Sequence, residues 1–258
     1  MSSLLLMIQF MTRYPIPVQI DFTVDRFVQG MKWMPIVGFL VGLPAAVLLY
    51  LCFPYFGGEV STFLALIVLI TVTGGLHLDG MGDSADGLFC YRSKERVLEI
   101  MRDSTLGTNG VVAVVLTILL KFITLKNIPL AGSVTALLCA PVLGRMAITW
   151  HTTVASYARE QSGMGSFTDR VGLPQALTAT VCSLLLTSIV FYFTGMSLVS
   201  AIWSLVILHG IAIALAVGFA FYLQHRIGGI TGDTIGATIE LSEMTSFLFF
   251  LLAWDFLV

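Results

Sequence analysis

Residues 59–87 read EVSTFLALIVLITVTGGLHLDGMGDSADG, an apolar run that ends in a glycine pair and is followed by three aspartates. The apolar part, 59–76, is long enough to cross the ~30 Å hydrocarbon core of a bilayer as a helix. Acidic side chains at the edge of such a segment need a compensating partner, most simply a divalent cation. This stretch therefore predicts a membrane helix that leads into a metal site.

The composition places the whole chain in the same class. Of its 258 residues, 57% are hydrophobic and 11% are charged, and the mean hydropathy is +0.94. We expect an all-α, polytopic integral membrane bundle that forms a single domain over 1–258, with a short N-terminal helix that lies at the interface or packs on the bundle and ends at Pro15 and Pro17. About seven crossings are predicted, the last of them short, at 34–53, 59–76, 110–126, 130–150, 176–195, 198–222 and 243–258.

The basic residues of the connecting segments gather on one predicted side of the membrane. Only Lys126 falls in a loop on the other side. The positive-inside rule therefore predicts a cytoplasmic N-terminus and an outer C-terminus, so that the polar segments 77–109, 151–175 and 223–242 face the cytoplasm. The net charge is −2 and no basic stripe is present, so nucleic acid is not an expected partner.

The first acidic motif carries Asp79, Asp83 and Asp86 at positions i, i+4 and i+7. On a helix these three side chains fall within a ~60° arc, where they repel one another unless a cation lies among them. Gly80 and Gly82 let a bulky group approach the backbone, which favours a metal-bound diphosphate. The structural alternative is a solvated helix end with incidental acids.

The next segment, 92–110, predicts an amphipathic helix with Val97, Leu98 and Met101 on its apolar side. Its polar side offers candidate substrate contacts: Glu99 and Asp103 one turn apart, and Arg102 to neutralise a phosphate. An interfacial helix with ordinary ion pairs is the alternative.

A third motif, GGITGDTIGATIELSE at 228–243, repeats the first one in the pattern GG-[LI]-x2-D-x2-G-x3-[DE]. Asp233 then matches Asp79, and Glu240 matches Asp86. The repeat predicts two parallel acidic helix starts that face one another across a shared cytoplasmic cavity; chance similarity is the alternative. The predicted ligands of one or two Mg²⁺ ions are Asp79, Asp83, Asp86, Asp233 and Glu240.

Other polar residues carry weaker signals. Arg145 lies within an apolar span, where it either extends to the surface or reaches a phosphate. His77 lies on the opposite side of its helix from Asp79, which favours a core role over metal ligation. A loop containing Arg159, Ser162, Gly163, Gly165, Phe167 and Thr168 is a weak candidate for closing over a substrate.

Four segments together resemble the adenosylcobinamide-GDP ribazoletransferase family, also called cobalamin 5′-phosphate synthase. They are FMTRYPIP, GGLHLDGMGDSADG, LEIMRDSTLGTNG and GGITGDTIGATIELSE, in the family's order and at similar separations along nearly the whole chain. Met81-Gly82 stands where the family usually has Leu-Ala, and Asn109 where an aromatic residue or His is frequent. Neither departure removes a candidate ligand.

The resemblance implies a Mg²⁺-dependent phosphotransferase of the cell inner membrane that acts in the nucleotide-loop assembly of cobalamin (vitamin B12) biosynthesis. Such an enzyme joins adenosylcobinamide-GDP to α-ribazole or its 5′-phosphate and releases GMP. Arg102 and Arg145 would assist at the phosphates, and Asp86 or Glu240 would accept the hydroxyl proton. Membrane lipid surrounds it, while assembly with other cobalamin-pathway enzymes and homo-oligomerisation stay open.

Two other classes compete. A membrane phosphotransferase of the CDP-alcohol type also uses an Asp-rich helix face with glycines, but its D-G-x-x-A-R run is absent, because Asp86-Gly87 is followed by Leu88, Phe89, Cys90 and Tyr91. A secondary transporter also uses glycine-broken helices and buried acids, but near the bilayer midplane. The acids here lie at predicted cytoplasmic helix ends, which favours catalysis.

Overall fold

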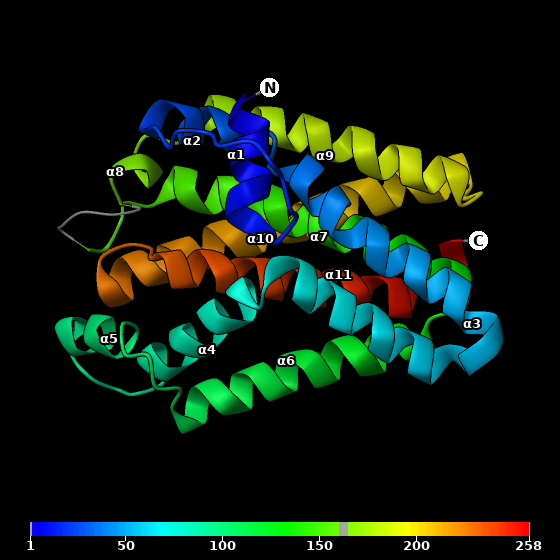
Figure 1. Ribbon diagram of the computed structural model, residues 1–258, viewed down its shortest axis with the longest axis horizontal. Helices are drawn as coiled ribbons and strands as arrows, with labels where there is room; N and C mark the ends of the chain where they lie inside the picture. The colour runs from blue at the N-terminus through cyan, green and yellow to red at the C-terminus, as the bar shows by residue number, and fades with distance from the viewer. Residues whose placement is uncertain (1, 160–164, 258) are drawn as a thin grey trace.

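The computed structural model describes residues 2–159 and 165–257, and in this part of the chain all regular elements are helices. An isolated bridge pairs Tyr157 with Ile230. The prediction of an all-α bundle is confirmed (Figure 1). The helices are α1 (Ser2–Met11), α2 (Val24–Met31), α3 (Met34–Thr73), α4 (Leu76–Leu88), α5 (Lys94–Ile100), α6 (Thr108–Asn127), α7 (Leu130–Val154), α8 (Gly165–Thr168), α9 (Leu173–Phe193), α10 (Leu198–Ile227) and α11 (Gly232–Leu257).

Six of the described helices, α3, α6, α7, α9, α10 and α11, are long and apolar enough to cross a membrane. The longest, α3, has 40 residues, which as a straight helix would measure ~60 Å, twice the hydrocarbon thickness. Its backbone is not helical at Gly57, where φ is 73°, and the ribbon reverses there (Figure 1). The predicted crossings 34–53 and 59–76 fall on its two arms.

The core of the bundle is α7. It is the most buried of the six long helices, and it packs against α3, α9, α10 and α11. Two glycines of α3 allow a close approach, since a Cβ on Gly38 or Gly42 would lie 2.2 Å from a carbonyl oxygen of α7. Small residues at such contacts let helix backbones pack tightly where lipid removes the usual hydrophobic driving force.

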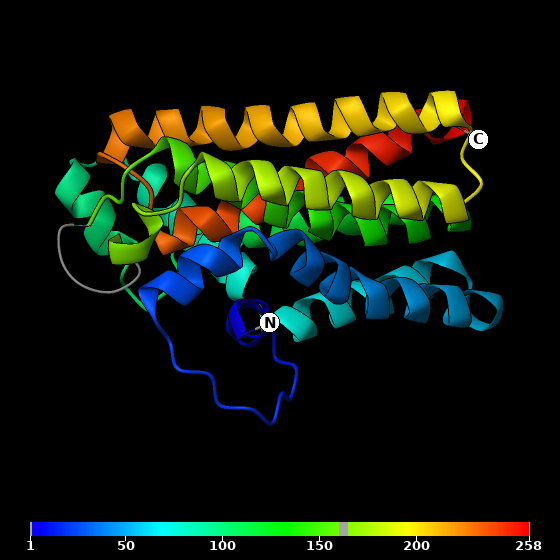
Figure 2. The same cartoon turned by 90° about the horizontal axis from the view of Figure 1, so that it is seen from above.

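The N-terminal helices lie across one side of the bundle. Helix α1 runs crosswise to the long helices in Figure 1 and is seen end-on in Figure 2. It packs against α2 and α3, and the Tyr14 hydroxyl donates a hydrogen bond to the Leu40 carbonyl oxygen at 2.7 Å. A short helix packed on the bundle agrees with one of the two predicted placements, but α1 ends at Met11, before the predicted end at Pro15 and Pro17.

Two predicted segments differ from the structure. The helix expected over 92–110 is α5, only Lys94–Ile100, because the Asp103 carboxylate accepts from the Thr105 N–H at 2.9 Å and holds a turn there. The last crossing, predicted as 243–258, is the second half of α11, a continuous helix of 26 residues. The third motif and the last crossing are therefore one rigid element.

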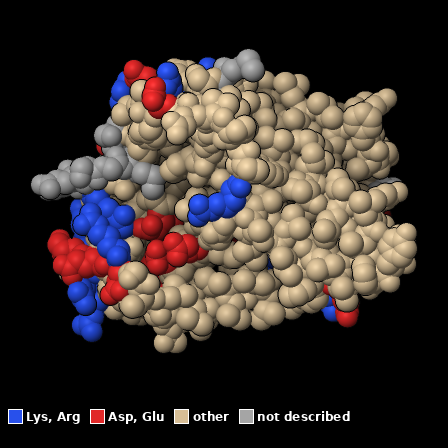
Figure 3. Space-filling view, viewed as in Figure 1, with Lys and Arg blue, Asp and Glu red and all other residues tan. Residues whose placement is uncertain are grey.

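Most charged side chains lie at one end of the bundle, whereas exposed aromatic side chains occur at both ends, with Phe89 and Tyr91 at the charged end. In Figure 3 most of the charged side chains of this face lie at the end where α4 and α5 lie, and most of the remaining surface is uncharged. At the other end of the bundle, strongly exposed aromatic side chains occupy the turns: Tyr55, Phe56, Tyr192, Phe193 and Phe256. Aromatic side chains are enriched at both membrane–water interfaces, so these residues fit a membrane boundary at that end of the bundle.

We expect the charged end to face the cytoplasm. With the four native cysteines replaced, a Tyr192→Cys variant should react with an impermeant maleimide in intact cells, whereas a Glu99→Cys variant should react only after permeabilisation. Both positions are exposed, so accessibility within the fold does not distinguish them. The reverse labelling pattern would contradict the predicted orientation.

Candidate active site

Glycine pairs connect the last turn of a long helix to each acidic motif. Gly74 and Gly75 have φ of 63° and 74°, and Gly228 and Gly229 have φ of 82° and 149°. Gly74 ends α3 and Gly228 ends α10, both in the left-handed conformation that favours glycine. A basic side chain covers each helix end, Arg13 over Gly74 and Lys94 over Gly228, where a cation interacts favourably with the helix dipole.

Helices α4 and α11 contact each other through backbone. A Cβ on Gly80 would lie 2.6 Å from the Asp233 carbonyl oxygen, and one on Gly236 would lie 3.3 Å from the His77 Cα. Later residues of α4 therefore face earlier residues of α11, and the two ribbons run in opposite directions (Figure 1). The motifs face one another as predicted, but the expected parallel orientation is wrong: α4 continues away from α3, whereas α11 turns back beside α10.

Three of the five predicted carboxylates meet at this contact. Asp79 and Asp233 line one cavity, and Asp83 lies near enough for their charges to act on it. Burial, and then the charges of Asp79, Asp233 and Asp86, raise the pKa of Asp83 to about 6. Arg159 offsets part of this repulsion by donating to Asp233 at 2.8 Å.

Asp86, predicted as a metal ligand and a catalytic base, contacts the backbone at the start of α6. One carboxylate oxygen accepts from the Gly107 N–H at 2.7 Å and the other from the Gly110 N–H at 2.8 Å. These N–H groups belong to the start of α6, which has no intrahelical partner for them. A Cβ at Gly107 or Gly110 would lie within 2.6 Å of the carboxylate, so the glycines of TLGTNG make room for it.

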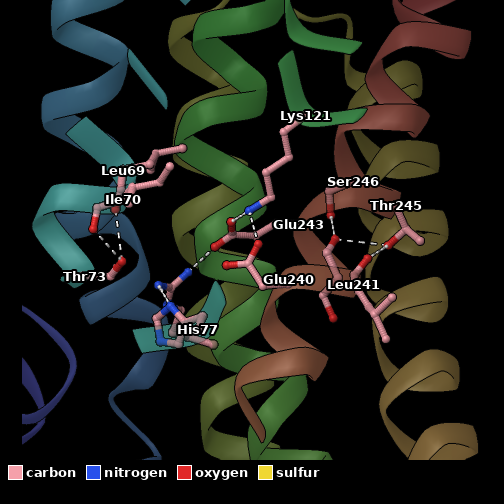
Figure 4. A network of polar contacts seen from close by, with 12 residues as sticks. Leu69, Ile70, Thr73, His77, Lys121, Glu240, Leu241, Glu243, Thr245 and Ser246 are labelled. Carbon is pink, nitrogen blue, oxygen red and sulfur yellow. Dashed lines mark hydrogen bonds and ion pairs between the residues drawn. The ribbon is translucent and has the colours of Figure 1, made fainter. Parts of the chain in front are cut away.

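Glu240 also lies outside the acid cluster. It is buried and forms an ion pair with Lys121 of α6 at 2.7 Å. Lys121 also reaches Glu243 at 2.5 Å, and Figure 4 shows its amine between the two glutamates, with His77 on the far side of Glu243. Lys121 was missed by the sequence analysis, although a lysine inside the apolar run 110–126 was a visible signal.

Arg145 completes this buried network. It is fully buried, donates to Glu243, and its other terminal nitrogen lies 3.3 Å from His77 Nδ1. The predicted surface position of Arg145 is wrong, because its side chain is fully buried, and its predicted contact with a phosphate stays a prediction. Arginine only donates, so Nδ1 accepts and the neutral ring carries its hydrogen on Nε2, which agrees with a pKa of His77 lowered by burial and by Arg145. The predicted core role of His77 agrees with this contact.

The remaining predicted substrate contacts are dispersed. Glu99 pairs with Arg96 at 2.8 Å on the exposed side of α5, and Asp103 holds its own turn. No ion pair of Arg102 is formed within the described residues.

Of the two predicted glycines, Gly82 packs against Leu106, and only Gly80 lies in the cavity with Asp79 and Asp233. Arg159 of the predicted loop reaches the acids, while Ser162 and Gly163 lie outside the described residues.

The acid cluster suits Mg²⁺ only in combination with a substrate. Within the described ranges, no group of three or more His, Cys, Asp or Glu side chains is arranged to hold a metal ion alone. Mg²⁺ commonly takes one or two carboxylates and completes its shell with water and substrate phosphates. Asp79 and Asp233, with the repelled Asp83 beside them, have the donor chemistry for such a site.

Replacing Asp86 should weaken the start of α6. In Asp86→Asn, the amide NH₂ would face one of the two N–H donors and leave it unpaired, which costs about 1–3 kcal/mol. We expect a lower free energy of unfolding and faster amide exchange at Gly107 and Gly110. Asp21→Asn, at an exposed carboxylate, is the control. Unchanged exchange in Asp86→Asn would exclude the capping role.

The response to Mg²⁺ should depend on pH through Asp83. Its pKa in the folded chain, about 6, lies above the ordinary value of 3.8, so protonated Asp83 stabilises the fold below about pH 4, and this contribution is lost as the pH rises through about 6. A cation relieves the repulsion only where Asp83 is ionised. Millimolar Mg²⁺ should therefore raise the Tm more at about pH 7.5 than at about pH 5, and Asp83→Asn should remove most of the difference. An equal rise at both values would contradict this.

Comparison with known proteins gives a consistent assignment. The sequence model of the family described as cobalamin-5-phosphate synthase matches residues 3–251. A protein of Clostridium acetobutylicum named adenosylcobinamide-GDP ribazoletransferase is 39% identical over 241 residues, covering 93% of this chain and 92% of the relative. A protein of the same name from Acetivibrio thermocellus is 36% identical over 255 residues, 98% of each chain.

The match extends over complete chains. The Fusobacterium nucleatum protein of that name is 36% identical, with 100% of both chains covered. No solved structure matches the chain. Both acidic motifs lie within the matched residues, and the family resemblance stated from the four motifs is confirmed: the chain belongs to the cobalamin-5-phosphate synthase family.

Proposed function

We propose that this protein is an adenosylcobinamide-GDP ribazoletransferase that works at the cytoplasmic face of the cell inner membrane. The observation that carries the proposal is the meeting of Asp79, Asp83 and Asp233 where α4 crosses α11, within a chain of this family. A hydroxyl oxygen of α-ribazole, or of its 5′-phosphate, attacks the phosphorus nearer cobinamide. The bond between the two phosphates breaks, GMP leaves, and the hydroxyl proton passes to a base.

Asp79 and Asp233 are the residues that would hold Mg²⁺, because they share one cavity wall on two helices that Gly80 and Gly236 keep in contact. Mg²⁺ held there would supply positive charge against the charge that develops on the transferred group. In this assignment the protein is a Mg²⁺-dependent phosphotransferase of the EC 2.7.8 class. Through the ion, Asp79 and Asp233 would position the diphosphate beside Asp83.

Arg159 is the residue we assign to phosphate charge, in place of Arg102 and Arg145. Its guanidinium is mostly buried beside Asp233, and its Nε has no hydrogen-bond partner among the described residues. A planar guanidinium with free donors suits phosphate oxygens. Arg145 is committed to Glu243, and no contact of Arg102 with the acids supports its predicted role.

Asp83 is the carboxylate we assign as the proton acceptor. Asp86 and Glu240, the predicted bases, are engaged by N–H groups and by Lys121 respectively. A base is most effective when its pKa lies near the working pH, and the pKa of Asp83, raised to about 6 by burial and neighbouring carboxylates, approaches that range.

The competing classes receive less support. Buried ionisable residues in a membrane bundle are also typical of transporters, and Lys121, Arg145, Glu240 and Glu243 form such a set. Each of them is paired with an opposite charge, however, as expected for a structural network. The named relatives are ribazoletransferases, which argues equally against a CDP-alcohol phosphotransferase.

Arg159→Ala should lower kcat/KM for adenosylcobinamide-GDP by about 10²-fold, the usual cost of losing one transition-state charge contact. The assay is Mg²⁺-dependent GMP release by the purified protein with α-ribazole phosphate as the second substrate. Arg170→Ala is the matched control, since Arg170 pairs with Asp25 at the surface. Equal rates for Arg159→Ala and wild type would remove Arg159 from the site.

Asp83→Asn should lower kcat by about 10²–10⁴-fold, the usual contribution of a general base, and should abolish the acidic limb of the pH profile. Glu99→Gln, at an exposed carboxylate outside the cluster, should retain the wild-type rate. An Asp83→Asn enzyme with normal kcat and an unchanged pH profile would contradict the assignment. Absence of GMP release by the folded wild-type protein would contradict the proposed function itself.

A further inference from the structure

A cavity of about 100 Å³ lies between the N-terminal helices and the α4–α11 contact. Its outer wall consists of aromatic and sulfur-containing side chains, Phe10 and Met11 of α1, Phe27 and Met31 of α2, and Phe167 of α8. Its inner wall carries Asp79, Gly80 and Asp233. One end of the cavity is therefore apolar, and the other end is the acid cluster.

We propose that this cavity binds the aromatic base of the ribazole substrate. The inference rests on the proposed function and adds to it a binding site for the attacking nucleoside. The base is a benzimidazole, a flat fused ring with no N–H donor. The cobinamide macrocycle of the other substrate is many times larger than the cavity. Guanine, the other base in the reaction, carries several N–H and carbonyl groups.

Polarity selects the benzimidazole over guanine, which is similar in size. The cavity of about 100 Å³ is smaller than the ~150 Å³ that accepts a benzene ring, so the flexible methionines in its wall must move to admit a fused ring. Most of the lining is apolar. A guanine here would lose hydration without replacement partners, and an unpaired buried polar group is costly.

The lining also has the geometry that ring recognition uses. Phe27 lies 3.9 Å from Phe167 and 5.4 Å from Phe10 between ring centroids, and the contact with Phe10 is edge-to-face. Aromatic faces and methionine sulfur atoms interact favourably with a further ring. These three phenylalanines come from α1, α2 and α8, so the crosswise N-terminal segment gains a role in substrate binding.

The position of the cavity connects the base to the reaction. Asp79 and Asp233 belong to its wall and to the cluster that acts on Asp83. A nucleoside whose ring fills the apolar end directs its sugar toward these carboxylates. The ribose hydroxyl then enters the region where Asp83 accepts its proton and where the diphosphate is held.

Leu76 is a position where a substitution tests the cavity without disturbing the acids. It lines the cavity, is 41% exposed, and occupies the first position of α4. A Leu76→Trp variant would fill the mouth, and Leu76→Phe would fill it partly. Leu173 is a matched control, because it is 57% exposed, also begins a helix, and lies outside this cavity.

The first measurement is direct binding of α-ribazole to the detergent-solubilised full chain by titration calorimetry, with adenosine as a polar-base comparison. We expect α-ribazole to bind at least about 10-fold more tightly than adenosine. Leu76→Trp should weaken α-ribazole binding at least about 10-fold and Leu76→Phe by less, while Leu173→Trp should remain within about 2-fold of wild type. A Tm within a few degrees of wild type verifies that each variant is folded.

The second measurement is steady-state turnover, which separates the two proposals. Leu76→Trp should raise the KM for α-ribazole and leave the KM for adenosylcobinamide-GDP unchanged. Wild-type affinity for α-ribazole in Leu76→Trp, or a rise only in the KM for adenosylcobinamide-GDP, would overturn the cavity assignment while the transferase function stands. Displacement of α-ribazole by added phospholipid without turnover would assign the cavity to an acyl chain. If the wild-type protein releases no GMP, the proposed transferase function is contradicted. The binding titration still tests whether the cavity binds the base of α-ribazole.

Discussion

The backbone contact between α4 and α11 is the constraint on which the rest of the site depends. Gly80 meets the Asp233 carbonyl and Gly236 meets the His77 backbone, so any larger side chain at either position would push the helices apart. The contact brings Asp79 and Asp233 to one cavity wall and places Asp83 under their charges. Close packing of small residues, which holds membrane helices together in general, here also sets the spacing of Asp79 and Asp233.

A second set of charges fixes the helices that carry the first set. Lys121, Arg145, Glu240 and Glu243 connect α6, α7 and α11, and His77 brings in α4. Removing one member would leave a buried charge without its partner, a loss of about 3–5 kcal/mol in comparable networks. The chain therefore uses its acidic residues in two ways: those of the network hold the bundle, and those at the glycine contact are left under mutual repulsion that a cation can relieve.

Much of this fold could be predicted from the sequence because hydrophobic length and glycine pairs report directly on membrane helices. The reversal at Gly57 and the two motifs at Gly74 and Gly228 lie where the sequence indicated them. The direction of a helix after a glycine pair could not be predicted. The two glycine pairs are followed by similar residues, yet α4 continues away from α3, whereas α11 turns back beside α10. Spacing along a helix shows which side chains share a face, but not which face meets which neighbour.

The candidate site was predictable only in part for the same reason. Asp86 has the spacing of a ligand, yet its partners are N–H groups more than twenty positions away at Gly107 and Gly110. Glu240 has the matching position in the repeat, yet Lys121 neutralises it from another helix. Such partners depend on tertiary packing. Only Lys121, a basic residue inside an apolar run, indicated one of them in the sequence.

Manganese binding tests the division between the two sets of acids most directly. Electron paramagnetic resonance with Mn²⁺ in place of Mg²⁺, in the presence of GDP as a diphosphate, would compare wild type with Asp79→Asn, Asp233→Asn and Glu240→Gln. We predict that both aspartate variants lose the bound-manganese signal and that a folded Glu240→Gln variant retains it. Loss of manganese only in Glu240→Gln, with normal binding in the aspartate variants, would contradict the assignment.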